Sequence, residues 1–95
     1  MKLLGRGRLV DFLSSHADAR SWIAHWIAEI EETEWTNSQA IKSKFPAASF
    51  LKDNIVVFNV KGNRYRLVVH VAYQTEIVVV TWIGTHAEYS KRYFG

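Results

Sequence analysis

The fold is decided by one stretch, 55–89, which reads IVVFNVKGNRYRLVVHVAYQTEIVVVTWIGTHAEY. Its three apolar, β-branched runs lie at 55–60, 64–73 and 77–83. Short polar segments separate these runs, a pattern that predicts three antiparallel strands joined as a meander. Gly62 and Asn63 lie in the first break and both tolerate a positive φ, so we expect a tight hairpin turn there.

A short helix is predicted directly after the third run, because Thr85 and Glu88 have the spacing of a capping box. His86 would open this helix, and Tyr89 would share a face with it one turn further on. The positive end of the helix dipole attracts anions and disfavours a protonated imidazole, so neutral His86 would lie beside an anion site. The alternative is structural: Thr85 and Glu88 only cap, His86 is solvated and Tyr89 packs on the sheet. We favour that alternative for Glu88 and a functional role for His86.

Length and composition limit the classes of protein. The chain has 95 residues, 48% of them hydrophobic, so we expect one domain over 1–95 with its own core. It contains no cysteine, which excludes disulfides, thiol chemistry and thiolate metal sites. The sequence shows no signal peptide and no apolar run long enough to span a membrane, so a soluble cytoplasmic protein without membrane contact is expected.

Upstream of the meander the sequence predicts a short strand and three helices. The strand is expected at Lys2–Leu4, a first helix at 8–14, a second after a cap pair at Ser15 and Asp18, and a third after a cap pair at Thr36 and Gln39. The second helix carries a single apolar stripe made of Ala19, Trp22, Ile23, Trp26, Ile27 and Ile30. We expect this stripe to pack on one face of the sheet, with its tryptophans in the core rather than stacked on nucleobases.

Charge is distributed unevenly along a chain whose net charge is only +3. An acidic cluster ends the second helix at Glu29, Glu31, Glu32 and Glu34. Basic residues gather further on, at Lys61, Arg64, Arg66, Lys91 and Arg92. Such segregation favours an anionic partner at the carboxy-terminal end, which charge alone leaves as either nucleic acid or an acidic protein.

The central strand predicts where two of these cations point. Arg64 and Arg66 share one parity, opposite to that of the core-facing positions, so both guanidiniums are expected on the face away from the helices. There they would chelate phosphate oxygens in bidentate fashion. The structural alternative is that they solubilise a sheet edge or pair with acidic residues.

Several short motifs follow one another along the chain. They are HADA at 16–19, EW at 34–35, FPAASF at 45–50, FNVKGNRYR at 58–66 and IGTHAEY at 83–89. Together they resemble the HigB toxin family of bacterial type II toxin–antitoxin modules. The resemblance implies an α+β, RelE-like fold, with N-terminal helices on one face of a small antiparallel sheet and a short C-terminal helix. It also implies a ribosome-dependent mRNA endonuclease that inhibits translation, and a cognate HigA antitoxin carrying a helix-turn-helix.

Metal-independent RNA cleavage needs a base for the 2′-hydroxyl, cations at the phosphorane and an acid for the departing 5′-oxygen. The sequence offers no carboxylate or histidine cluster for a metal, so we expect neither metal nor cofactor and assign the chemistry to side chains. Arg66 would stabilise the phosphorane, His86 would act as base or acid, and Tyr89 would orient or donate. The residues expected to hold the RNA backbone are Lys61, Asn63, Arg64, Lys91 and Arg92.

Two other classes stay open, because a fold does not transfer a function. A ParE-like inhibitor would use the same fold to arrest a topoisomerase, although the pairing of His86 with Arg66 would then have no purpose. A non-toxic domain would use the basic face to bind an acidic protein. A neighbouring gene for a small helix-turn-helix protein would argue against this last class, but it would not separate the inhibitor from the nuclease.

Overall fold

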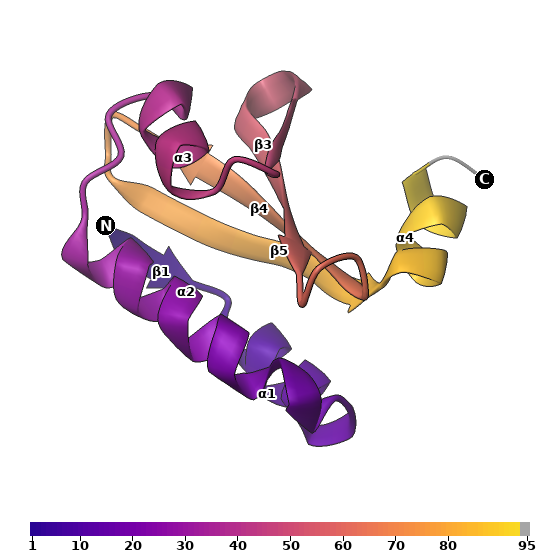
Figure 1. The fold of residues 1–95 in the computed structure, drawn as a ribbon. Coiled ribbons are helices and arrows are strands. Elements are labelled where there is room, and N and C mark those ends of the chain that lie inside the picture. The colour runs from indigo at the N-terminus through magenta and orange to yellow at the C-terminus, as the bar shows by residue number, and fades with distance from the viewer. Residues whose placement is uncertain (94–95) are drawn as a thin grey trace.

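The computed structural model describes residues 1–93 as one five-stranded sheet with four α-helices (Figure 1). The strands are β1 (Lys2–Leu4), β2 (Ser49–Leu51), β3 (Ile55–Val60), β4 (Tyr65–Ala72) and β5 (Ile77–Thr85). The α-helices are α1 (Arg6–Ser15), α2 (Arg20–Glu32), α3 (Ser38–Lys44) and α4 (His86–Tyr93). Two turns of 3-10 helix, η1 (Ala17–Ala19) and η2 (Lys52–Asn54), join elements. None of the helices within residues 1–93 combines the length and apolar character that a membrane crossing requires.

The sheet has the strand order β1-β5-β4-β3-β2. Strands β3, β4 and β5 form the antiparallel meander that the sequence predicts, and β2 adds antiparallel to β3. Strand β1 instead pairs with β5 in parallel, with Leu3 opposite Val78. The α+β class is therefore confirmed, with a mixed sheet because β1 contributes a parallel edge.

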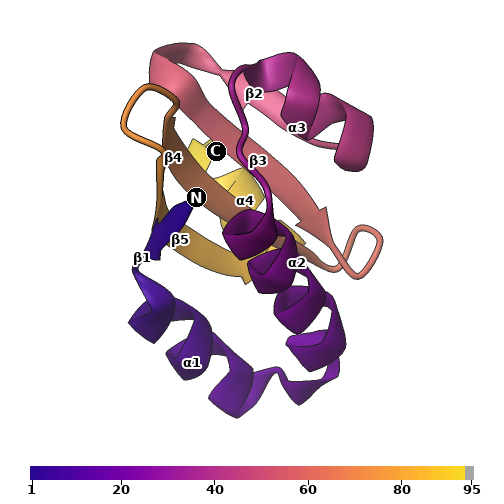
Figure 2. The ribbon, with the colours of Figure 1, turned by 90° about the vertical axis from the view of Figure 1, so that its left-hand side faces the viewer.

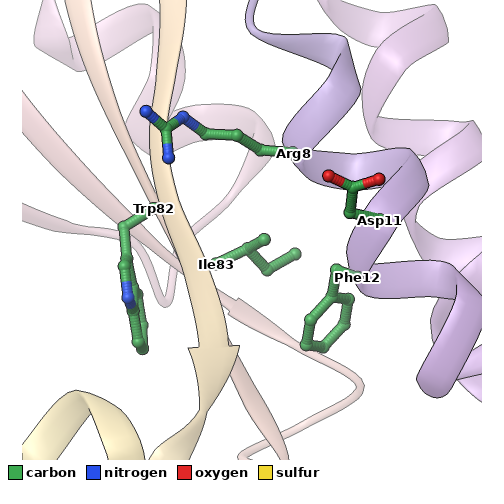
Figure 3. A pocket seen from close by; sticks show the side chains of 5 residues that line it. All are labelled: Arg8, Asp11, Phe12, Trp82 and Ile83. Atoms are coloured by element: carbon green, nitrogen blue, oxygen red, sulfur yellow. The ribbon is translucent and has the colours of Figure 1, made fainter.

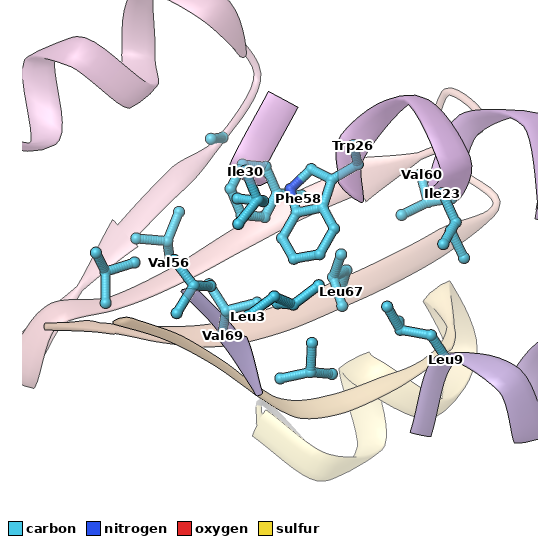
Figure 4. Close-up of a cluster of buried hydrophobic side chains, with 14 of the residues drawn as sticks. Leu3, Leu9, Ile23, Trp26, Ile30, Val56, Phe58, Val60, Leu67 and Val69 are labelled. Atoms are coloured by element: carbon cyan, nitrogen blue, oxygen red, sulfur yellow. The ribbon is translucent and has the colours of Figure 1, made fainter. Parts of the chain in front are cut away.

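The main core lies between the sheet and the layer of α1, α2 and α3 (Figures 2 and 4). The stripe on α2 contributes Ile23, Trp26 and Ile30, each at most 1% exposed. Trp26 meets Phe58 of β3 edge to face, with 5.5 Å between ring centroids. From β4 the core receives Tyr65, Leu67, Val69 and Val71. The prediction that the stripe packs on one face of the sheet is confirmed, and α4 lies on the opposite face.

The hairpin between β3 and β4 is tight, as predicted, but its left-handed residues differ from those expected. Positive φ angles occur at Lys61 (54°) and Gly62 (68°) rather than at Gly62 and Asn63. The amide of Arg64 donates to the carbonyl of Lys61 across the turn at 3.4 Å. Arg64 thus belongs to the turn, and β4 starts at Tyr65.

Two predicted helix caps are wrong. The cap pair predicted at Ser15 and Asp18 does not form, and α2 begins after η1 with no side-chain cap. The Asp18 carboxylate instead accepts hydrogen bonds from Arg64 and Tyr65. Helix α3 is capped one residue later than Thr36, by Asn37, whose side-chain oxygen accepts from the amide of Ala40 at 3.1 Å. Asp18 gains an ion pair with Arg64, which a cap position would not provide.

An irregularity in β5 changes which side chains face the helices. Val80 pairs with Val69 and Trp82 pairs with Val68, so Thr81 is an extra residue in β5. Such a bulge reverses the alternation of the residues that follow. Figure 3 shows the result: Ile83 points toward Phe12 of α1, and Trp82 leaves the strand on the other side.

Candidate nucleic-acid interface

Helix α4 starts with the predicted capping box. The Glu88 carboxylate accepts from the amide of Thr85 at 2.8 Å, and the Thr85 hydroxyl accepts from the amide of Glu88 at 3.1 Å. The hydrogen bond from the Thr85 amide lowers the pKa of the Glu88 carboxyl, and the Thr85 side chain lowers it further. The amide of His86 donates to the carbonyl of Arg64 at 3.0 Å, which ties the start of α4 to the hairpin. The exposed side chain of His86 is therefore held on a fixed backbone.

Tyr89 and Arg66 lie together on the sheet face that the N-terminal helices leave uncovered. Tyr89 is only 7% exposed and packs with Val57 and Val68. The Arg66 guanidinium carbon lies 6.0 Å from the centroid of the Tyr89 ring, within the range of a cation–π contact. The Tyr89 ring thus packs on the sheet, which is the structural role considered in the sequence analysis, and it also contacts the Arg66 guanidinium.

The backbones of Arg66 and His86 lie near each other at one corner of the sheet. Arg66 is paired across the strands with Gly84, two residues before His86. Its guanidinium donates to the carbonyls of Tyr65 at 3.2 Å and Asn63 at 3.3 Å, which restricts where the half-buried side chain points. Of the three residues assigned to the chemistry, Arg66 and His86 therefore border one corner, and Tyr89 packs against Arg66.

The other predicted RNA contacts surround this corner unevenly. Lys61 and Asn63 are exposed on the hairpin, and Lys91 and Arg92 are exposed on the last turns of α4. Arg64 departs from its predicted place because a turn residue does not follow strand alternation. Its guanidinium donates to Asp18 at 3.0 Å, so it faces the helical layer rather than the side of Arg66.

Asp18 is a residue whose contacts the sequence did not predict. Its carboxylate accepts from the Tyr65 hydroxyl at 2.7 Å in addition to Arg64. The hydrogen bond from Tyr65 lowers the pKa of Asp18, and the charge of Arg64 lowers it further. The same hydrogen bond raises the pKa of Tyr65. Asp18 thus joins the start of α2 to the base of the hairpin.

We expect Asp18→Asn to lower the thermal unfolding midpoint at pH 7, and the difference from wild type to shrink as the pH falls below about 4. A carboxyl whose folded pKa is depressed stabilises the fold above its unfolded pKa, and this contribution is lost as the pH falls through the folded pKa. Thermal melts of wild type and variant between pH 2 and 8 would measure the difference. Asp11→Asn, on the exposed surface of α1, is the control. A pH-independent difference would contradict an origin in the Asp18 charge.

Trp82 is the second residue that the sequence analysis missed. Strict alternation from Val78 and Val80 places it in the main core, but the bulge at Thr81 moves it to the face of Tyr89. Its ring lies 6.2 Å from that of Tyr89 and 5.8 Å from the guanidinium carbon of Arg92. The signal available in the sequence was Gly84, a small residue two positions from a large one in the same strand.

These features define a small α+β protein with an exposed histidine, a supported arginine and a basic, aromatic surface at one corner of its sheet. Within residues 1–93 no group of three or more metal-ligating side chains comes together. Residues 19–92 match the model of the HigB toxin family, described as the RelE-like toxic component of a toxin–antitoxin system. The match covers most of the chain, which therefore belongs to this family, and membership implies an antitoxin partner. No curated protein sequence matches the chain significantly.

Proposed function

We propose that this toxin is an mRNA endonuclease that acts on the ribosome and thereby inhibits translation. In the proposed reaction the 2′-oxygen attacks the adjacent phosphorus, the bond from phosphorus to the 5′-oxygen breaks, and a cyclic phosphate and a 5′-hydroxyl result. The observation that supports it most is the pairing of Arg66 with Gly84, two residues before His86. With that register, the backbone positions of a permanent cation and of a group able to transfer protons are close in space, which is what the proposed reaction requires.

The roles follow from chemistry and position. His86 takes the proton of the 2′-hydroxyl or supplies one to the 5′-oxygen, since its side chain is exposed at the start of α4. Arg66 stabilises the negative charge that grows on the phosphorane. Tyr89 orients Arg66 through its ring, which the guanidinium covers.

The basic residues around the corner hold the RNA backbone. Lys61 and Asn63 reach it from the hairpin, and Lys91 and Arg92 reach it from α4. Arg64 contributes with the guanidinium donors that Asp18 does not use, because the group has five and the ion pair is exposed. Contacts of this kind position RNA without reading its sequence.

The partners follow from the same proposal. The substrate is mRNA on the ribosome, so the toxin acts in the cytoplasm. The antitoxin is of the HigA type and carries a helix-turn-helix. Neither the chemistry nor the proposed partners involve a membrane.

We expect the wild-type chain, induced without antitoxin, to arrest growth and to produce new 5′ ends confined to translated mRNAs. His86→Ala abolishes both effects because the proton transfer is lost, and we expect the variant to remain folded since this side chain is exposed. His25→Ala, which removes an exposed histidine of α2, is the matched control and keeps full toxicity. Growth arrest with intact mRNA would disprove the nuclease and direct attention to a protein target such as a topoisomerase.

A further inference from the structure

We propose that Trp82 is a stacking platform for an unpaired nucleobase of the RNA, next to the corner formed by Arg66 and His86. This inference rests on the proposed function and adds a binding residue to it. Single-stranded nucleic acids bind where aromatic rings take the bases and cations take the backbone. The surface around Trp82 supplies both kinds of group.

The Trp82 ring packs against the sheet at Gly84. A Cβ atom added at Gly84 would lie 2.5 Å from Cζ2 and 2.6 Å from Cη2 of the indole, so the ring occupies space that only glycine leaves open. Tyr89 lies beside it with an interplanar angle of 45°. The ring is therefore supported from below while the side chain as a whole remains only partly buried. A stacking surface held in this way loses little conformational entropy when it binds.

A hollow of about 400 Å³ adjoins this ring, lined by Trp82, Glu88, Lys91 and Arg92. It is an open depression on the surface rather than an enclosed cavity. Two cations and an indole meet there, which matches the phosphate and the base of one nucleotide. The guanidinium carbon of Arg92 lies 5.8 Å from the centroid of the indole ring, so a base that stacks on this face takes the place of Arg92, which then faces the phosphate.

Glu88 is the opposing charge in the hollow. One oxygen of its carboxylate accepts from the Thr85 amide, and this cap holds the group beside Gly84. A carboxylate repels phosphate, which directs the backbone of the RNA toward Lys91 and Arg92 at the rim. It also accepts hydrogen bonds, so a base with an exocyclic amino group gains a partner there.

The test measures binding of a short fluorescein-labelled single-stranded RNA to the full-length His86→Ala protein at 50 mM salt. We expect Trp82→Ala in this background to raise Kd about tenfold, because base–aromatic stacking contributes about 1–3 kcal/mol per base. Trp82→Phe retains a ring and stays within about threefold of the parent. The salt dependence of Kd keeps its slope in both variants since no charge is removed. Trp22→Ala, which removes a half-buried tryptophan from α2, is the matched control, and circular dichroism checks the fold of each variant.

An abasic version of the same RNA separates stacking from other effects, since the Trp82 substitution leaves its Kd unchanged. The inference would be overturned if Trp82→Ala lost as much affinity for the abasic RNA as for the intact RNA. It would also be overturned if Trp82→Ala left Kd unchanged, or if the parent protein bound no RNA. Loss of antitoxin binding alone would assign this surface to a protein partner instead. If wild type fails to cut mRNA but Trp82 governs RNA binding, the nuclease proposal fails and the platform stands. If wild type cuts and Trp82 has no effect, only the platform fails.

Discussion

Arg66→Ala is expected to lower the rate of RNA cleavage by a factor of about 10² to 10³, the usual effect of removing one group that stabilises transition-state charge. The Arg66 side chain is half-buried but is not part of the main core, so the variant stays folded. The loss should lie in kcat rather than in KM, because the guanidinium acts on charge that develops only in the transition state. Single-turnover cleavage, measured at increasing concentrations of toxin over a ribosome-bound message, separates the rate of the chemical step from the affinity for the message.

Two further variants sharpen this test. Arg66→Lys keeps the charge but loses the planar fork, so we expect partial activity between wild type and Arg66→Ala. Arg20→Ala removes an exposed arginine from the start of α2 and should leave cleavage unchanged. A folded Arg66→Ala protein with normal kcat and a raised KM would reduce Arg66 to an RNA-binding residue, and full activity would remove it from the mechanism.

The parts of the fold that sequence predicted well depend on local chemistry. The capping box at Thr85 and Glu88 involves residues three apart, so the pattern fixes the start of α4 without knowledge of the rest of the chain. The stripe of α2 is equally local, because helical spacing alone places Ile23, Trp26 and Ile30 on one side. The closeness of Arg66 and His86 follows from the predicted strand that carries Arg66, the predicted start of α4, and the antiparallel pairing of β4 with β5.

The parts that sequence did not predict depend on contacts between distant residues. Asp18 forms its hydrogen bonds with Arg64 and Tyr65, 46 and 47 positions away, and these contacts outweigh its use as a helix cap. Trp82 is displaced by one inserted residue in β5, and period-two counting has no means of detecting a bulge. Both corrections change the proposed site, since one turns Arg64 toward the helices and the other brings an indole to α4.

Trp26→Ala is expected to produce the largest loss of stability, about 3–5 kcal/mol, through lost burial and the cavity that remains. The side chain is fully buried between α2 and the sheet, where it meets Phe58. Small domains are stable by only about 5–15 kcal/mol, so such a loss removes a large share of the total stability. Urea unfolding followed by circular dichroism measures the change. Trp26→Phe should lose much less, because it keeps a ring against Phe58 and removes an indole N–H that is buried without a partner in the described part of the chain.

This variant also separates loss of fold from loss of chemistry. An antitoxin that binds only the folded toxin stabilises it by mass action, so co-expression should restore soluble Trp26→Ala protein. Arg66→Ala should need no such rescue, because we expect it to fold alone and to lose only the rate of cleavage. Trp22→Ala, at the edge of the same stripe, should lose less stability than Trp26→Ala because its side chain is only half-buried. Equal losses at both positions would mean that the contact of Trp26 with Phe58 contributes no more to stability than the packing of Trp22.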